Sequence, residues 1–221
     1  MVGKAAVSAS KLKPTGPAAG IQSLAVYANS FQGGVIVNIL GICGSIRKES
    51  HNRKLLQAAQ KLLPEGVGMQ YFDCGDLPLY NGDLDGKQKP EPVARLLEII
   101  RNCDALLIAS PEYNYSIPGV LKNAIDWASR PAYQSVLAYK PAAIISSSIS
   151  FVGGARMQSH LRQVLNSTLT RIYPAPEFIV PQIQNKFDAD ANLVDQETAG
   201  RLKKYISGFV IWAGRAAVLP K

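Results

Sequence analysis

Hydrophobic residues along this chain alternate between short continuous runs and stretches with helical spacing. The continuous runs, which are typical of strands buried on both faces, occur at 35–43, 67–72, 105–110, 142–147 and, more weakly, 177–180. Between these runs, apolar residues recur every three or four positions over 55–63, 93–100, 119–128, 161–168 and 202–213. The pattern therefore predicts five strands that alternate with five helices.

This alternation predicts an α/β fold with an open, doubly wound sheet of five parallel strands and helices on both faces. In such sheets, ligands bind at the carboxyl ends of the strands, where the strand order reverses. We therefore expect function to lie in the loops that follow the first, third and fourth strands. These loops are residues 44–52, 111–118 and 147–155.

The first 34 residues differ in composition from the rest of the chain. They are rich in Ala, Ser, Gly and Pro, and residues 1–36 contain three lysines and no acidic residue. Because such a stretch has no periodic apolar face, we predict a flexible, disordered leader at 1–34 and a single domain at 35–221. A plastid or mitochondrial transit peptide is the alternative, although the leader contains no arginine. If the leader is not such a signal, the expected compartment is the cytoplasm.

The composition excludes several classes of protein. Hydrophobic residues make up 47% and charged residues 18%, so the chain can bury a full core. We expect no integral membrane segment, because no apolar run reaches the roughly 18 residues of a membrane helix. Three cysteines without a CxxC pair and only two histidines predict no metal site. The net charge of +8 is scattered, which favours a small anionic ligand and predicts no nucleic-acid partner.

The loop after the first predicted strand has the residue types of a phosphate site. Residues 44–52 read Gly-Ser-Ile-Arg-Lys-Glu-Ser-His-Asn and lead directly into a helix. A helix N-terminus offers unpaired amides, to which Ser45, Arg47 and Ser50 add hydroxyl and guanidinium donors. The loop matches neither GxxxxGK(S/T) nor GxGxxG. We therefore predict a site for a dianionic phosphate, with a helix cap made by Ser50 or Asn52 alone as the alternative.

The loop after the third predicted strand predicts a pocket for a flat ring. Residues 111–118 read Pro-Glu-Tyr-Asn-Tyr-Ser-Ile-Pro. Two tyrosines and an asparagine between prolines can frame a heteroaromatic ring, whose polar edge would meet backbone amides and carbonyls. Taken alone, the loop could also be a packed surface turn. Beside a phosphate loop on the same sheet edge, it predicts a bound mononucleotide.

Three segments of the chain resemble the NADPH-dependent FMN reductases. They are the GSxRxxSxN loop, the PEYNYSxPGxLKNAIDW segment at 111–127 and the Gly-Gly-Ala-Arg run at 153–156. The chain is similar to the branch that contains bacterial chromate and quinone reductases and plant NADPH:quinone reductases. The similarity runs from about Val37 to the last predicted helix, and the leader lies outside it.

The resemblance implies a flavodoxin-like fold, one FMN per subunit, NADPH or NADH as co-substrate, and a homodimer or homotetramer. It implies that the FMN phosphate is held by Ser45, Arg47, Ser50, His51 and Asn52. It also implies that the isoalloxazine ring is lined by Pro111, Glu112, Tyr113, Asn114 and Tyr115, and on its other edge by Ser147, Ser148 and Gly153. The chain departs from the family pattern at two positions, where Glu49 adds a negative charge and Ser150 replaces a glycine. Arg156 or a cation of a neighbouring subunit is a candidate to contact the 2′-phosphate of NADPH.

The expected function is two-electron transfer from NAD(P)H through FMN to a quinone, with chromate and similar acceptors as further candidates. Because the flavin N5 carries the hydride, no catalytic acid or base is assigned to the protein. The alternative is a non-catalytic electron carrier or redox-controlled interaction module, although carriers of this kind are expected to be acidic and this chain is basic. The aromatic residues Trp127, Tyr133 and Tyr139, with Arg130 among them, predict a subunit interface, with packing beneath a loop as the alternative.

Overall fold

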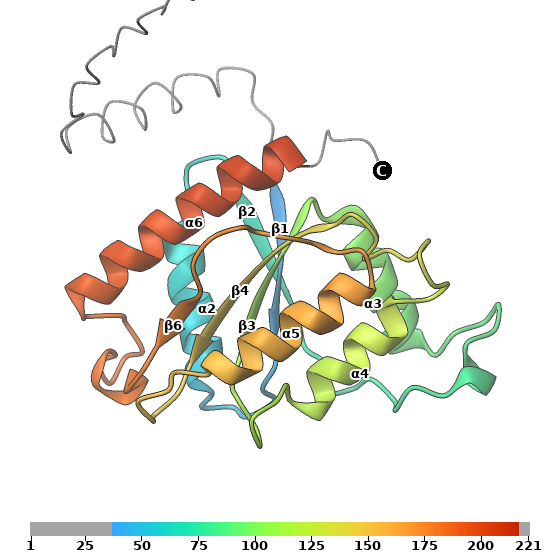
Figure 1. Ribbon diagram of the computed structural model, residues 1–221, viewed down its shortest axis with the longest axis horizontal. Helices are drawn as coiled ribbons and strands as arrows, with labels where there is room; N and C mark the ends of the chain where they lie inside the picture. The colour runs from blue at the N-terminus through green and yellow to red at the C-terminus, as the bar shows by residue number, and fades with distance from the viewer. Residues whose placement is uncertain (1–36, 217–221) are drawn as a thin grey trace, which may run out of the picture. The chain divides into compact units, whose positions relative to one another are not determined.

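The computed structural model describes residues 37–216 and has a parallel sheet between two layers of helices (Figure 1). The leader predicted at 1–34 lies outside the described residues. The sheet contains β1 (Asn38–Cys43), β2 (Gly68–Phe72), β3 (Ala105–Ser110) and β4 (Pro141–Ser147). The strand order is β2-β1-β3-β4-β5 with parallel pairing throughout the described residues, which confirms the predicted doubly wound α/β fold.

The last position of the sheet holds two short strands where the sequence pattern predicts one. β5 (Arg171–Ile172) pairs with the start of β4, and β6 (Phe178–Val180) pairs with its end. Pro174 and Pro176 lie between them, and because proline has no amide hydrogen to donate, the ladder is interrupted there. The predicted strand at 177–180 is therefore only the second half of this position.

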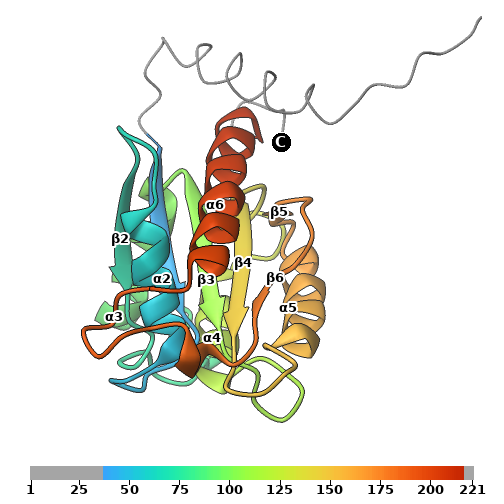
Figure 2. The same ribbon diagram turned by 90° about the vertical axis from the view of Figure 1, so that its left-hand side faces the viewer.

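The helices divide between the two faces of the sheet (Figure 2). One face is covered by α2 (His51–Lys61) and α6 (Gln196–Ala216). The other face is covered by α3 (Glu91–Asn102), α4 (Gly119–Ala128) and α5 (Ala155–Ser167). The short 3-10 helices η1 (Gly82–Leu84) and η2 (Ile183–Asn185) lie in connecting segments.

Alternate residues of the central strands point to opposite faces and build two apolar clusters. In β1, Ile39 belongs to the cluster under α2 and α6, whereas Leu40 belongs to the cluster under α3, α4 and α5. In β3, Leu107 and Leu106 divide in the same way. Because both faces of these strands are buried, their sequences are continuously apolar, and this continuity is what predicts them.

The loops after β1 and β3 start side by side, and a glycine permits this. The amide of Gly44, just beyond β1, donates to the carbonyl of Ala109 at 2.8 Å. A Cβ atom at position 44 would lie 2.9 Å from the Ser110 Cβ atom and would overlap the Ser110 hydroxyl. A side chain of any size at this position would push the two strand ends apart.

We predict that Gly44→Ala lowers the free energy of unfolding by about 1–3 kcal/mol, because the added methyl group overpacks the contact with Ser110. Gly200→Ala is the matched control, since a Cβ atom at this exposed position of α6 meets nothing within 4 Å. The control is expected to raise stability by about 0.5–1 kcal/mol through helix propensity. Urea denaturation measures both values, and equal stability of the two variants would contradict the prediction.

Candidate functional site

Three loops meet at the carboxyl ends of the central strands, at the lower edge of the sheet in Figure 2. They follow β1, β3 and β4, which are neighbours in the sheet. β2 lies on one side of β1 and β3 on the other, so the strand order reverses between β1 and β3. Ligands of doubly wound sheets bind at this reversal, and the sequence places its polar motifs there.

The loop after β1 presents amide groups at the N-terminus of α2. Within the described part of the chain, the N–H groups of Ile46, Lys48 and Glu49 have no hydrogen-bond acceptor. The Ser45 side chain is buried, and its Oγ accepts a long hydrogen bond of 3.4 Å from the Arg47 amide. The Arg47 side chain is exposed. Unpaired amides beside a guanidinium at a helix N-terminus form a suitable site for an anion.

Ser50 has the capping role that the sequence offers as an alternative. Its buried side chain accepts a hydrogen bond of 3.4 Å from the Arg53 amide and so caps α2. The cap occupies one acceptor site of this hydroxyl. Its Oγ atom also lies 3.9 Å from the Cys43 Sγ atom, a contact in which either group can donate, so the hydroxyl hydrogen can turn to a ligand when the thiol donates. Capping and phosphate binding are therefore compatible at Ser50.

Glu49 does not place its negative charge among these amides. Its carboxylate pairs with Lys54 at 3.0 Å, and its side chain is 78% exposed. The hydrogen bond and the charge of Lys54 lower the pKa of Glu49. This departure from the family pattern therefore points to solvent and leaves the anion site free of a competing carboxylate.

His51 is held in its neutral form at the start of α2. Partial burial, together with the charges of Lys54 and Arg47, lowers the pKa of its imidazole. Its Nδ1 atom is buried and has no hydrogen-bond partner among the described residues. At neutral pH the ring therefore offers one N–H donor and one acceptor rather than a positive charge.

Asn52 links the first loop to the third. Its buried side-chain amide donates to the Ser147 carbonyl at 3.0 Å and accepts from the Ser147 amide at 2.9 Å. The sequence predicts a phosphate contact for Asn52, but the structure commits its side chain to the end of β4. Ser147 keeps a buried Oγ atom that has no partner among the described residues. That hydroxyl is an unsatisfied group at the predicted ring edge.

The loop after β3 forms a tight turn. The amide of Tyr113 donates to the Ser116 carbonyl at 3.0 Å, and the amide of Ser116 donates back at 2.9 Å. Asn114 and Tyr115, at the centre of the turn, have φ angles of 49° and 64°. The side chains of Tyr113 and Tyr115 are 46% and 62% exposed, so the turn presents two aromatic rings. Pro111 connects the turn to β3.

Glu112 does not direct its carboxylate at the predicted ring pocket. It accepts from the amides of Arg156 at 3.0 Å and Met157 at 3.3 Å, in the first turn of α5. It also pairs with the Arg156 guanidinium at 3.2 Å. The carboxylate of Glu112 therefore caps a helix. The prediction that Glu112 lines the ring now rests on its backbone groups in the loop.

The loop after β4 is organised by serine hydroxyls and two glycines. The Ser148 Oγ accepts from the Ser150 amide at 3.1 Å, and the Ser150 Oγ accepts from the Val152 amide at 3.3 Å. Positive φ angles occur at Gly153 (64°) and Gly154 (89°), and not at Ser150. The serine that replaces a family glycine thus adopts an ordinary backbone conformation, and its hydroxyl stabilises the loop.

The sequence analysis does not identify four residues of this sheet edge. Ile46, in the loop after β1, is 53% exposed, and Ile149 and Phe151, in the loop after β4, are 65% and 83% exposed. In the sequence, each of these three is an isolated apolar residue in a polar loop. Such residues are common on protein surfaces and do not by themselves indicate a binding site. Gln158 is fully buried and donates to the Ser146 hydroxyl and the Phe178 carbonyl, both at 2.9 Å. These two hydrogen bonds link α5 to the end of β4 and to β6.

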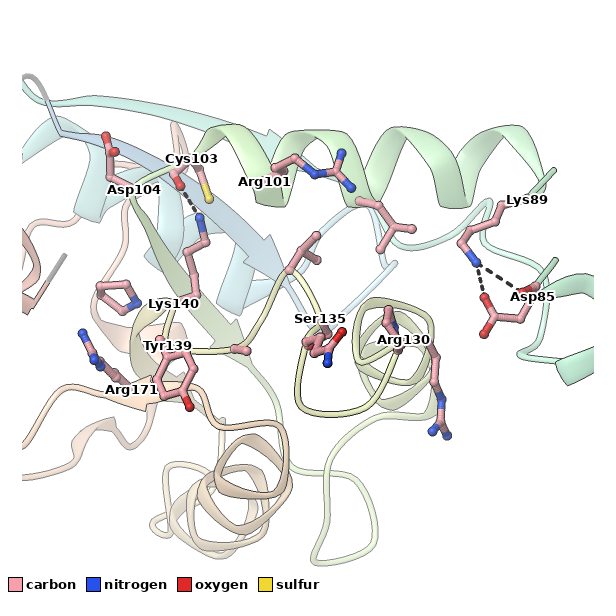
Figure 3. A pocket seen from close by; sticks show the side chains of 16 residues that line it. Asp85, Lys89, Arg101, Cys103, Asp104, Arg130, Ser135, Tyr139, Lys140 and Arg171 are labelled. Atoms are coloured by element: carbon pink, nitrogen blue, oxygen red, sulfur yellow. Dashed lines mark hydrogen bonds and ion pairs between the residues drawn. The ribbon is translucent and has the colours of Figure 1, made fainter. Parts of the chain in front are cut away.

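A cavity of about 730 Å³ lies at the opposite edge of the sheet, between α3 and the residues that precede β4 (Figure 3). Several cations line it, but most are engaged in structural contacts. Lys140 donates to the Cys103 carbonyl, Arg171 stacks on Tyr139, and Lys89 pairs with Asp85. The loops at the carboxyl ends of the strands are therefore the better candidate for binding an anion.

No helix within residues 37–216 is long and apolar enough to cross a membrane. The same residues contain no group of three or more His, Cys, Asp or Glu side chains that could hold a metal ion.

Comparison with known proteins identifies the family of this chain. Residues 37–185 match the model of the family described as NADPH-dependent FMN reductase. An NAD(P)H-dependent FMN reductase of Pseudomonas aeruginosa is 43% identical over 81% of this chain and 96% of its own length. The NAD(P)H:quinone oxidoreductase of Solanum tuberosum is 44% identical over 76% of this chain and 88% of its own.

A solved structure agrees with this result. FerB, a flavoenzyme NAD(P)H:(acceptor) oxidoreductase from Paracoccus denitrificans, superposes with a TM-score of 0.74 at 38% identity. The match covers 81% of this chain and 98% of FerB. Sequence, fold and the three loops at the reversal of strand order thus lead to one conclusion: this chain belongs to the NADPH-dependent FMN reductase family.

Proposed function

We propose that this protein is an FMN-dependent oxidoreductase that transfers two electrons from NAD(P)H to quinones. The observation that carries the proposal is the meeting of an anion site and an aromatic turn where the strand order reverses. Relatives named as quinone reductases, from Pseudomonas putida and Escherichia coli, support the choice of quinone as acceptor. When bound, FMN supplies the chemistry, which is hydride transfer at its N5 atom.

The first loop fits the phosphate of FMN. Ser45, Arg47 and Ser50 would bind it together with the unpaired amides of the loop, because a dianion at a helix N-terminus is stabilised by N–H donors and by a nearby cation. His51 would add its single N–H donor. Asn52 acts indirectly, by holding the start of α2 against Ser147.

The second and third loops fit the isoalloxazine ring. Within the described residues, the amides of Glu112, Asn114 and Tyr115 have no acceptor and can meet the polar edge of a flat ring. The unsatisfied hydroxyl of Ser147, together with Ser148 and Gly153, would border the other edge. The exposed rings of Tyr113 and Tyr115 would exclude water from one side of the site.

No side chain of the protein needs to act as a redox group. The three cysteines of the chain are all unpaired and buried. Burial raises the pKa of Cys74 to about 12, so its thiol is not ionised at neutral pH. For the compartment we propose the cytoplasm, with a plastid or mitochondrion as the alternative if residues 1–34 are a transit peptide.

The direct test is to purify the full chain, record its absorbance and measure NADPH oxidation with a benzoquinone. We expect a flavin absorption band and steady turnover with ping-pong kinetics, because both substrates would use the same face of the site in turn. A flavin band without turnover would indicate an electron carrier. Absence of a flavin band, with no gain in activity on adding FMN, would contradict the proposal.

We predict that Arg47→Ala weakens FMN binding about 10- to 150-fold. The guanidinium offers a planar fork to phosphate oxygens, and charge-assisted hydrogen bonds contribute about 1.5–3 kcal/mol each. The fold should persist, because the Arg47 side chain is exposed. Apoprotein should accumulate, and excess FMN should restore most of the turnover.

Lys48→Ala is the control for loss of charge in the same loop, since Lys48 is also exposed. It should cost much less affinity than Arg47→Ala. Retention of FMN through gel filtration separates the two variants. Equal retention would show that Arg47 is not the phosphate ligand.

We also propose that the protein is a homodimer or homotetramer, although the structure corrects one of the predicted interface residues. Trp127 is fully buried and donates to the Pro78 carbonyl at 2.8 Å, so it belongs to the core. Tyr133 is 69% exposed and remains available to a second copy.

Light scattering of the full chain should therefore give a mass two or four times 23.8 kDa. The physical reason is that exposed aromatic residues are enriched at the centres of interfaces. A single species of monomer mass at micromolar concentration would refute this assembly.

A further inference from the structure

The turn after β3 needs support that its own backbone does not supply. Tyr115 has a φ angle of 64°, a left-handed conformation that is unfavourable for a large side chain. Among residues 37–216, the backbone hydrogen bonds that close the turn are the two between Tyr113 and Ser116. Its aromatic rings are largely exposed in the structure. Contacts from outside the turn must therefore keep Tyr115 in place.

Those contacts come from the first turns of α5. The Arg156 guanidinium lies over the Tyr115 ring, 4.2 Å from the ring centroid. His160, four residues further along α5, has its Nδ1 atom 3.1 Å from the Ser116 Oγ. Residues four apart lie on the same face of a helix. One face of α5 thus contacts the centre and the end of the turn.

Glu112 fixes the position of Arg156 in return. The N-cap of α5 is Gly154, which has no side chain to bond the first amides of the helix. Glu112 takes over this role and binds both the backbone and the guanidinium of Arg156, with its side chain only 13% exposed. A carboxylate at a helix N-terminus is doubly favoured, by hydrogen bonds and by the helix dipole. The loop that contains the turn therefore anchors the residue that supports it.

We propose that Arg156 is a positioning residue, which holds Tyr115 at the edge of the ring site and does not bind the 2′-phosphate of NADPH. The inference rests on the proposed function, since it concerns the same site. The Arg156 charge is compensated by Glu112, and one face of its guanidinium is covered by an aromatic ring. A guanidinium that is already paired with a carboxylate and stacked on a ring has little free charge or donor capacity for binding a phosphate group.

The test compares Arg156→Ala, Arg156→Lys and Tyr115→Ala with both co-substrates. We expect Arg156→Ala to lower kcat/KM for the quinone about three- to fivefold, the size of a cation–π contact. Any loss in kcat/KM for the co-substrate, measured separately, should be equal with NADPH and NADH. Lysine should restore the quinone value only in part, because an ammonium group keeps a cation–π attraction but lacks the planar fork that binds Glu112. In a Tyr115→Ala background, Arg156→Ala should have less than about a twofold further effect.

Hydrogen exchange, measured on the protein without FMN, tests the role of Arg156 independently of enzymatic turnover. Hydrogen exchange at the amides of Tyr113 and Ser116 should quicken about three- to fivefold in Arg156→Ala, because the turn opens more often. Arg95→Ala is the matched control: this arginine of α3 is 48% exposed, close to the 50% of Arg156, and also pairs with a glutamate. It should leave exchange at both amides unchanged.

Two results would overturn the proposal. A loss confined to NADPH and partly restored by Arg156→Lys would assign the residue to the 2′-phosphate. Unchanged exchange at Tyr113 and Ser116 in Arg156→Ala would show that the contact does not hold the turn. Absence of flavin binding in the wild-type protein would refute the proposed function instead, and the exchange experiment would still decide whether Arg156 holds Tyr115.

Discussion

Two polar side chains that reach from one loop to another hold this site together. Asn52 bonds both backbone groups of Ser147, and Glu112 bonds two amides of α5. Backbone groups at the ends of strands and helices lack partners within their own element, so a buried side chain that satisfies them is strongly favoured. The same bonds that satisfy the backbone also fix the three loops relative to one another. A ligand that enters such a site finds it already ordered, and little of its binding energy is lost in arranging the loops.

The ability of the loop after β1 to bind an anion depends on the direction of its charged side chains more than on their number. The loop contains Arg47, Lys48 and Glu49 in succession, so in the sequence one of two positive charges is offset by a carboxylate. In the structure, Glu49 is drawn towards Lys54 at the side of α2. The amides and the guanidinium are left without a competing carboxylate.

The sequence predicts the strands and helices, their parallel layered arrangement and the position of the loops, because buried parallel strands and amphipathic helices have distinct periods. It predicts less well where single polar side chains go. Asn52 and Glu112 stand in the motifs expected for ligand contact, yet their partners are 95 and 44 residues away, and no local pattern encodes such pairs. Trp127 is predicted at an interface because it is aromatic, but its side chain is fully buried in the core. β5, with two residues, is too short for any period to show.

Because Gly154 has no side chain to cap α5, the loop after β3 cannot be transplanted alone into another protein of this fold. Because Glu112 caps α5, the ring loop and the helix after β4 form one unit, although they are separate in the chain. Transplanting the 111–118 segment alone into another sheet of this architecture would leave its carboxylate without amides to bind. The recipient's helix would in turn keep whatever cap it already had. In this scaffold the natural module for exchange is a loop together with the first turn of a helix that follows a different strand.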